Sequence, residues 1–200
     1  KRLPVVFNIG ARALTSQSLN VHCGHDDIFG VADTGWGMLF ARNAQESGDF
    51  CLISRRVAEA TQTPFFNIQD GFLTTHTIEN VRLPEPELMK LFVGHPSAKV
   101  RNFMDPRIPL MSGVVQNQDS YMKGKIGQRA YTDRIPDELA AGMAEWTALT
   151  GRHVAPISTY RTEDASEILV SMGTIADTAV AVVVSLLIAA PPTEAHAEPL

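Results

Sequence analysis

The sequence lacks the features that mark secreted, nucleic-acid-binding or membrane-spanning proteins. Its cysteines, Cys23 and Cys51, are too few and too far apart for a disulfide framework, so we expect a reducing, cytoplasmic location. The net charge of −5 provides no basic surface for nucleic acid or for an anionic membrane. The most apolar run, residues 175–190, contains Asp177 and is shorter than the roughly 20 residues of a membrane span. We predict a buried helix there instead.

The residues that are present indicate a globular α/β protein. With 44% apolar residues in a chain of 200, the sequence is long enough for one domain or a little more. Three short apolar segments, rich in β-branched and aromatic residues, predict strands at 3–9, 36–41 and 64–69. A helix between the last two completes a strand–helix–strand unit, which predicts a parallel sheet. The first strand begins almost at once, so we expect this domain to be incomplete at its N-terminus.

The helix after the second strand has a recognisable start and an apolar stripe. Asn43 is the predicted N-cap, and Glu46, three residues later, completes a capping box. Ile53 and Val57 recur at helical spacing and predict the buried face, whereas Glu59 is expected on the exposed face.

The later part of the chain differs in composition and in its pattern of apolar residues. Residues 80–136 are rich in proline, glycine, asparagine and glutamine, and they show little periodicity. We predict a connector there, with one short helix that has Pro86 in its first turn. Residues 136–151 predict an amphipathic helix, 166–174 a new strand and 175–188 the helix that follows it.

These elements divide the chain into four predicted parts. They are a parallel-sheet α/β domain over 1–82, a connector with helices over 83–154, the start of a second α/β domain over 155–190, and a flexible tail over 191–200.

A cluster of metal-ligating residue types follows the first strand. His22, His25, Asp26 and Asp27 are all possible ligands of a divalent ion. Their spacing matches no defined metal site, so we predict a hydrogen-bonded loop and no metal. Cys23 has no partner that suggests a nucleophile, which indicates an inert thiol.

Two further segments follow predicted strands. Asp70, Thr74, Thr75 and His76 lie just beyond the third strand, where open α/β sheets place their ligand crevices. A turn that caps the next helix explains the same residues slightly better from sequence alone, and both interpretations stay open.

Arg12 follows the first strand in the same way. Its permanently charged planar fork is suited to binding a carboxylate or phosphate through two hydrogen bonds, although a surface arginine is the alternative. The "SMGT" turn at 171–174 is a weaker anion-binding candidate, because it lacks the spaced glycines of a dinucleotide-binding loop.

Taken in order, these segments resemble the pyruvate:ferredoxin oxidoreductase family of thiamine-diphosphate and iron–sulfur enzymes. "VVFNIGARAL" resembles the family's strand and (A/G)-R-A-L turn, and "HCGHDDIFGVADTGWGML" resembles its G-D-H-x-D-(V/I) loop followed by x-T-G-x-x-M-L. "NAQE", "PFFNIQDGFLTTH", "QNQDSY", "LTGR" and "ILVSMGT" follow in the family's order. Each motif is weak alone, but the shared order extends to about Leu187.

The resemblance implies the pyrimidine-side domain of such an enzyme and the start of the domain that follows. It implies that Arg12 binds the carboxylate of a 2-oxoacid, and that His25 and Asp27 organise the adjoining loop. The whole enzyme would decarboxylate a 2-oxoacid to an acyl-CoA on thiamine diphosphate with Mg, and pass electrons through iron–sulfur clusters to ferredoxin or flavodoxin. It would be a homo-oligomer, with these cofactors bound mainly outside this chain and none on this chain alone.

The sequence also departs from the family pattern. The family's Y-P-I-T-P turn, its activating glutamate, its cysteine-rich domain and its diphosphate-binding domain are absent here, so this chain alone is predicted to be inactive. Leu73 and Thr77 replace the arginine and glutamate of the family's D-G-F-R-T-S-H-E segment. The alternative is therefore a non-catalytic structural module of the same ancestry in another multidomain redox protein, such as a sulfite reductase.

Overall fold

Three parallel strands form the sheet on which the molecule is built. The computed structural model describes residues 1–189, in which β1 (Val6–Ala11), β2 (Gly37–Phe40) and β3 (Phe65–Asp70) are arranged in the order β1-β3-β2. Ala11 pairs with Asp70, so the carboxyl ends of β1 and β3 meet at one edge of the sheet. All three predicted strands and the parallel α/β class are confirmed. The predicted tail over 191–200 lies outside the described residues.

The helix α2 (Ala44–Thr61) begins as predicted, but the second hydrogen bond of the capping box does not form. Asn43 Oδ1 accepts the Glu46 N–H at 3.0 Å, which confirms the N-cap. The Glu46 carboxylate does not return to Asn43, because it accepts the N–H and the guanidinium of Arg42 at 2.9 and 2.7 Å. The cap therefore also anchors the residue that follows β2.

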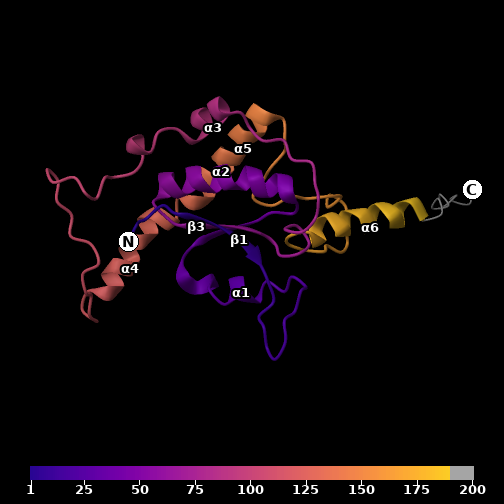
Figure 1. Cartoon of the computed structure of the whole chain (residues 1–200), viewed down its shortest axis with the longest axis horizontal. Coiled ribbons are helices and arrows are strands. Elements are labelled where there is room, and N and C mark those ends of the chain that lie inside the picture. Colours follow the sequence, from indigo (N-terminus) through magenta and orange to yellow (C-terminus); the bar gives the residue numbers. More distant parts are fainter. Residues whose placement is uncertain (190–200) are drawn as a thin grey trace, which may run out of the picture.

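Helices cover one face of the sheet, and a loop with one short helix covers the other (Figure 1). On the first face α2 packs with α3 (Pro86–Val93) and α5 (Ile135–Thr150), two helices whose presence the sequence predicted, around the fully buried Trp146. On the second face lie α1 (Asp26–Phe29) and the residues around it. Successive residues of β3 alternate between these two cores, which explains why the strand is almost continuously apolar.

The last described segment differs from the prediction. No strand forms over 166–174, and Ile168, Leu169 and Val170 are 63%, 75% and 86% exposed. A strand needs a neighbour for its backbone groups, and within residues 1–189 none lies beside this segment. The second α/β domain therefore stays a prediction.

The helix α6 (Ile175–Ala189) forms as predicted, but the expectation that it is buried is wrong. Ile175, Val182 and Leu186 are each more than half exposed. The helix extends away from the sheet and touches the rest of the chain mainly at its start (Figure 1). A helix that is apolar on all sides needs partners on all sides, and the described residues supply them at one end. Among residues 1–189, no helix has both the length and the apolarity to cross a bilayer.

Two further details differ from the prediction. The helix α4 (Tyr121–Thr132) lies within the predicted connector and was missed, because its glycines, charges and lack of buried residues give no helical stripe. Glu59 is 1% exposed rather than exposed, since the Arg55 guanidinium covers it and donates to its carboxylate at 2.6 Å.

Candidate functional site at the carboxyl edge of the sheet

The loop after β1 is closed by two aspartates. Both carboxylate oxygens of Asp27 accept the N–H of Arg12 at 3.1 Å, and Asp26 accepts the N–H of Leu14 at the same distance. His25 adopts the left-handed conformation at φ 59°, while His22 is exposed. The structure thus has the hydrogen-bonded loop that the spacing predicted, with Asp27 fixing the backbone of Arg12.

Asp70 joins this loop to a turn more than a hundred residues away. Its Oδ1 lies 2.8 Å from Nε2 of His25, and its Oδ2 accepts the N–H and the hydroxyl of Thr174 at 2.8 and 2.6 Å. Gly173, at φ +68°, allows this approach, because a Cβ there would lie 2.5 Å from Oδ1. The "SMGT" turn does hold an anion in this structure, and that anion is the chain's own Asp70.

The environment of Asp70 favours its charged form. Burial alone would raise the pKa of the carboxyl, but the hydrogen bonds from Thr174 and His25 outweigh it and hold the pKa below its usual value. The carboxylate is therefore charged at neutral pH and available as an acceptor on both sides.

We expect Asp70→Asn to release the Thr174 turn. The amide NMR signal of Thr174 should shift in the variant, whereas the exposed Asp33→Asn should leave it unchanged. Because the folded pKa of Asp70 is depressed, its contribution is complete above the unfolded value of 3.8 and is lost only as the pH falls through the lower folded pKa. The midpoint of the wild-type Thr174 titration should therefore lie below pH 3.8. A Thr174 signal that is the same in Asp70→Asn and wild type contradicts this account.

Cys23 lies against the same network. Its thiol is 3.3 Å from the carbonyl of Ala11, and burial, followed by the charge of Asp70, raises its pKa to about 11. The ligating atoms of Cys23, His25 and Asp70 lie within 4.8 Å of one another, a grouping hidden in the sequence because Asp70 is distant along the chain. A metal would need the thiolate, whereas the high pKa and the hydrogen bonds of Asp70 favour a protonated, metal-free network. The absence of a metal stays a prediction.

Cys23 should accordingly react slowly with alkylating agents. A rise of the thiol pKa from 9.0 to about 11 lowers the thiolate fraction at neutral pH about 100-fold. Iodoacetamide labelling followed by peptide mass spectrometry should give a rate for Cys23 at least about 100-fold below that of free cysteine. In a Cys23→Ser variant all labelling comes from Cys51, so this variant separates the labelling of the two cysteines. Labelling of Cys23 as fast as the free amino acid would contradict the buried network.

The backbone of Arg12 is fixed, but its side chain is uncommitted, which here means that its guanidinium forms no ion pair with the described residues. Its guanidinium lies 4.7 Å above the ring of Phe72, and within residues 1–189 it makes no ion pair. The N–H of Gly71 donates to the carbonyl of Ala11 at 2.9 Å, so the turn after β3 lies directly beside Arg12. A partly buried arginine in this position can receive an anion through its planar fork.

The other residues after β3 form a turn that bonds to itself. Thr75 Oγ1 accepts the N–H of Phe72 at 2.9 Å and lies 2.7 Å from Nδ1 of His76. Thr74 is 5% exposed, and its hydroxyl has no partner among the described residues. The turn interpretation holds for Thr75 and His76, although no helix follows directly, and Asp70 belongs to the network described above.

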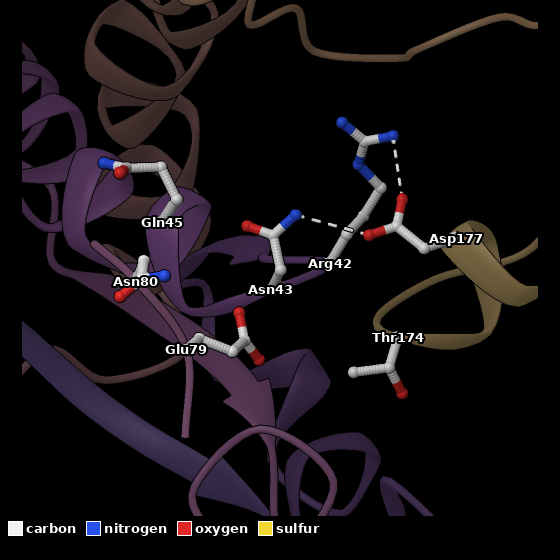
Figure 2. Close-up of a pocket in the computed structure, with 7 residues that line it drawn as sticks. All are labelled: Arg42, Asn43, Gln45, Glu79, Asn80, Thr174 and Asp177. Atoms are coloured by element: carbon white, nitrogen blue, oxygen red, sulfur yellow. Dashed lines mark hydrogen bonds and ion pairs between the residues drawn. The ribbon is translucent and has the colours of Figure 1, made fainter. Parts of the chain in front are cut away.

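A polar groove of about 490 Å³ lies where the start of α6 meets the start of α2 (Figure 2). Asp177 contacts Nη1 of Arg42 at 3.2 Å and Nδ2 of Asn43 at 3.3 Å. Glu79 accepts the N–H of Ala44 at 3.1 Å. Sequence reasoning missed Arg42 and Asp177 because nothing local links residues so far apart. Most of these polar groups are already paired with one another. The groove is therefore better described as the contact between α6, α2 and the segment at Glu79 than as a binding site.

The two departures from the family pattern can also be located. Leu73 is 50% exposed, and Oγ1 of Thr77 lies 3.2 and 3.1 Å from the carbonyl oxygens of Leu73 and Thr74. Oε1 of Glu79 lies 3.1 Å from the same hydroxyl, whose single hydrogen can be donated to any one of these three acceptors. Thr77 therefore stabilises its own turn.

The open parallel sheet with its crossover helix defines an α/β domain, a fold class in which ligand crevices lie at the carboxyl edge of the sheet. The chain belongs to the family described as pyruvate flavodoxin/ferredoxin oxidoreductase, thiamine diphosphate-binding, whose model matches residues 1–143. The resemblance inferred from the motifs is thus confirmed.

Curated relatives extend the similarity over most of the chain. It is 32% identical over 186 residues to a pyruvate-flavodoxin oxidoreductase of Klebsiella pneumoniae, covering 92% of this chain and 16% of that protein. It is 35% identical over 179 residues to pyruvate synthase subunit PorA of Pyrococcus furiosus, covering 88% and 45%. It is 30% identical over 173 residues to a pyruvate:ferredoxin oxidoreductase of Moorella thermoacetica, covering 86% and 15%. The chain therefore spans less than half the length of each of these relatives.

Proposed function

We propose that this chain is part of a 2-oxoacid oxidoreductase that uses ferredoxin or flavodoxin. The whole enzyme would oxidatively decarboxylate a 2-oxoacid such as pyruvate, form an acyl-CoA and pass the electrons to the carrier protein. Membership of the family and the names of the relatives support this activity. The two free cysteines support a reducing, cytoplasmic location, and homo-oligomeric assembly remains part of the proposal.

The observation that carries the proposal is the state of Arg12. Its backbone is fixed by Asp27, its guanidinium lies over Phe72, and no carboxylate of the described residues neutralises it. A permanent charge held at a sheet edge suits the carboxylate of a small acid, which would accept two parallel N–H bonds from the guanidinium. Arg12 would then bind and orient the substrate.

The described residues do not fit an iron–sulfur cluster or the diphosphate of thiamine. A cluster needs more thiolates than the two cysteines of this sequence supply. For the diphosphate, two backbone donors at helix starts on this edge are already used, since the N–H of Thr174 donates to Asp70 and that of Ala44 donates to Glu79. We therefore assign thiamine diphosphate, its Mg ion and the clusters mainly to the rest of the enzyme, where thiamine diphosphate would supply the carbanion chemistry.

A reconstitution assay tests this proposal. The complete protein or subunit set that contains this chain should reduce ferredoxin or flavodoxin only when a 2-oxoacid, CoA and thiamine diphosphate are all present. Omitting each component in turn is the internal control. A purified, cofactor-loaded complex that reduces its carrier independently of every 2-oxoacid tested would overturn the proposal.

The second candidate is a non-catalytic module in another multidomain redox protein. The departures at Leu73 and Thr77 favour it, because one side chain is half exposed and the other bonds within its own turn. The neighbouring reading frame separates the two candidates. A Y-P-I-T-P turn and cysteine-rich clusters would favour the enzyme, and a flavodoxin-like or sirohaem-binding neighbour would favour the module.

A further inference from the structure

Phe72 is the aromatic side chain against which the Arg12 guanidinium lies. The guanidinium carbon is 4.7 Å from the centre of the Phe72 ring. The ring of His76 also stacks on Phe72, with a centroid distance of 4.4 Å and an interplanar angle of 14°. Phe72 is therefore in contact with two flat polar groups, of which Arg12 is the uncommitted one.

The backbone of Phe72 is held in a conformation that an aromatic residue rarely adopts. Its φ is +62°, in the left-handed region. The N–H of Phe72 donates to Thr75 Oγ1 at 2.9 Å, and the N–H of His76 donates to the carbonyl of Phe72 at 3.3 Å. Strain of this kind persists where the surrounding contacts impose it and is often found at functional sites.

The preceding glycine brings this strained residue close to Arg12. A Cβ at Gly71 would lie 2.5 Å from the carbonyl oxygen of Ala11 and 2.9 Å from Cγ of Arg12. Only a residue without a side chain allows the turn to approach β1 this closely. The end of β1, the glycine and the strained turn therefore together place the Phe72 ring under the guanidinium.

We propose that Phe72 is a positioning residue for Arg12. This inference rests on the proposed function, since it concerns the carboxylate of the 2-oxoacid that Arg12 would bind. An arginine side chain has many rotamers, and only some of them direct its planar fork at a bound carboxylate. The ring selects one of them by cation–π contact and stacking, so the fork is ordered before the substrate arrives.

The proposal predicts a change in KM rather than in kcat. In the complete enzyme, Phe72→Leu should raise the KM for the 2-oxoacid about five- to tenfold, the size of a lost cation–π contact, with kcat within about twofold. Phe72→Tyr should restore the parent KM, because it keeps the ring. Phe7→Leu, a change at a half-exposed aromatic residue on β1, is the matched control and should leave the KM unchanged. Phe72→Met provides the same comparison if Phe72→Leu does not fold.

A double-mutant cycle with Arg12→Ala completes the test. If Phe72 acts through Arg12, then Phe72→Leu should change the KM less than about twofold when Arg12 is already alanine. An equal effect with and without Arg12 would overturn the proposal, because Phe72 would then act on the fold alone. A large effect of Arg12→Ala with a silent Phe72→Leu would overturn this inference and leave the proposed function standing. A silent Arg12→Ala would overturn this inference and the carboxylate-binding role of Arg12, whereas the proposed activity fails only if the carrier is reduced independently of every 2-oxoacid.

Discussion

Arg12→Ala in the complete enzyme is expected to lower kcat/KM for the 2-oxoacid roughly thirtyfold or more, mainly through KM. The guanidinium lies at the carboxyl edge of the sheet without an ion pair in residues 1–189, so a substrate carboxylate would be its strongest partner. Losing a charge-assisted bidentate contact should cost on the order of 2–4 kcal/mol, and 1.4 kcal/mol corresponds to about a tenfold change. Steady-state kinetics with varied 2-oxoacid measure this directly.

Two comparisons make the Arg12 result specific. The affinities for CoA and thiamine diphosphate should stay nearly unchanged, because the described donors at this edge fit a carboxylate and not a diphosphate. Arg12→Lys should recover only part of the loss, since an ammonium cannot reproduce the planar fork. A kcat/KM within about threefold of the parent would identify Arg12 as a surface residue and favour the structural module.

The largest effect on stability is expected at Arg152. Its Nε and Nη2 donate to the two carboxylate oxygens of Asp49, each at 2.8 Å, and the side chain of Asp49 is 2% exposed. The guanidinium also lies 5.5 Å from the centre of the Trp146 ring in the main core. Arg152→Ala leaves a buried carboxylate without its charged partner, so the free energy of unfolding should fall by about 3 kcal/mol or more. Urea titration, on this chain or on the complete protein, measures the difference.

Arg129→Ala is the matched control for Arg152. Arg129 also pairs with an aspartate, Asp133, but the two side chains are 74% and 57% exposed on α4. An exposed pair of this kind contributes only about 0–1 kcal/mol. If the two variants unfold at the same urea concentration, the bond from Arg152, just after α5, to Asp49 of α2 does not stabilise the fold as the geometry indicates.

The features that the sequence predicted are those fixed by neighbouring residues. Strands, the Asn43 cap, the Pro86 start of α3 and the end of α5 at Gly151 all depend on spacing within a few positions. The position of Arg12 after β1 followed from the same signals, but its uncommitted guanidinium and its contact with Phe72 did not. Both depend on how β1 pairs with β3.

The features that were missed depend on contacts between distant residues or on contacts that do not form. Asp70 with Thr174 and Asp49 with Arg152 each join residues more than a hundred positions apart, and no periodicity indicates such pairs. The strand predicted over 166–174 has the right residue types, but strand formation also needs a neighbouring strand. Glu59 followed the helical pattern for an exposed residue, and its salt bridge with Arg55 allowed it to be buried.

The Asp70 carboxylate connects the turn before α6 with the loop after β1. One oxygen of this carboxylate accepts both bonds from Thr174, so a displacement of that turn breaks the two bonds together. The other oxygen of Asp70 lies against His25, two residues before Asp27, which fixes the Arg12 backbone. The support of the loop that carries Arg12 and the docking of the turn before α6 therefore share one carboxylate.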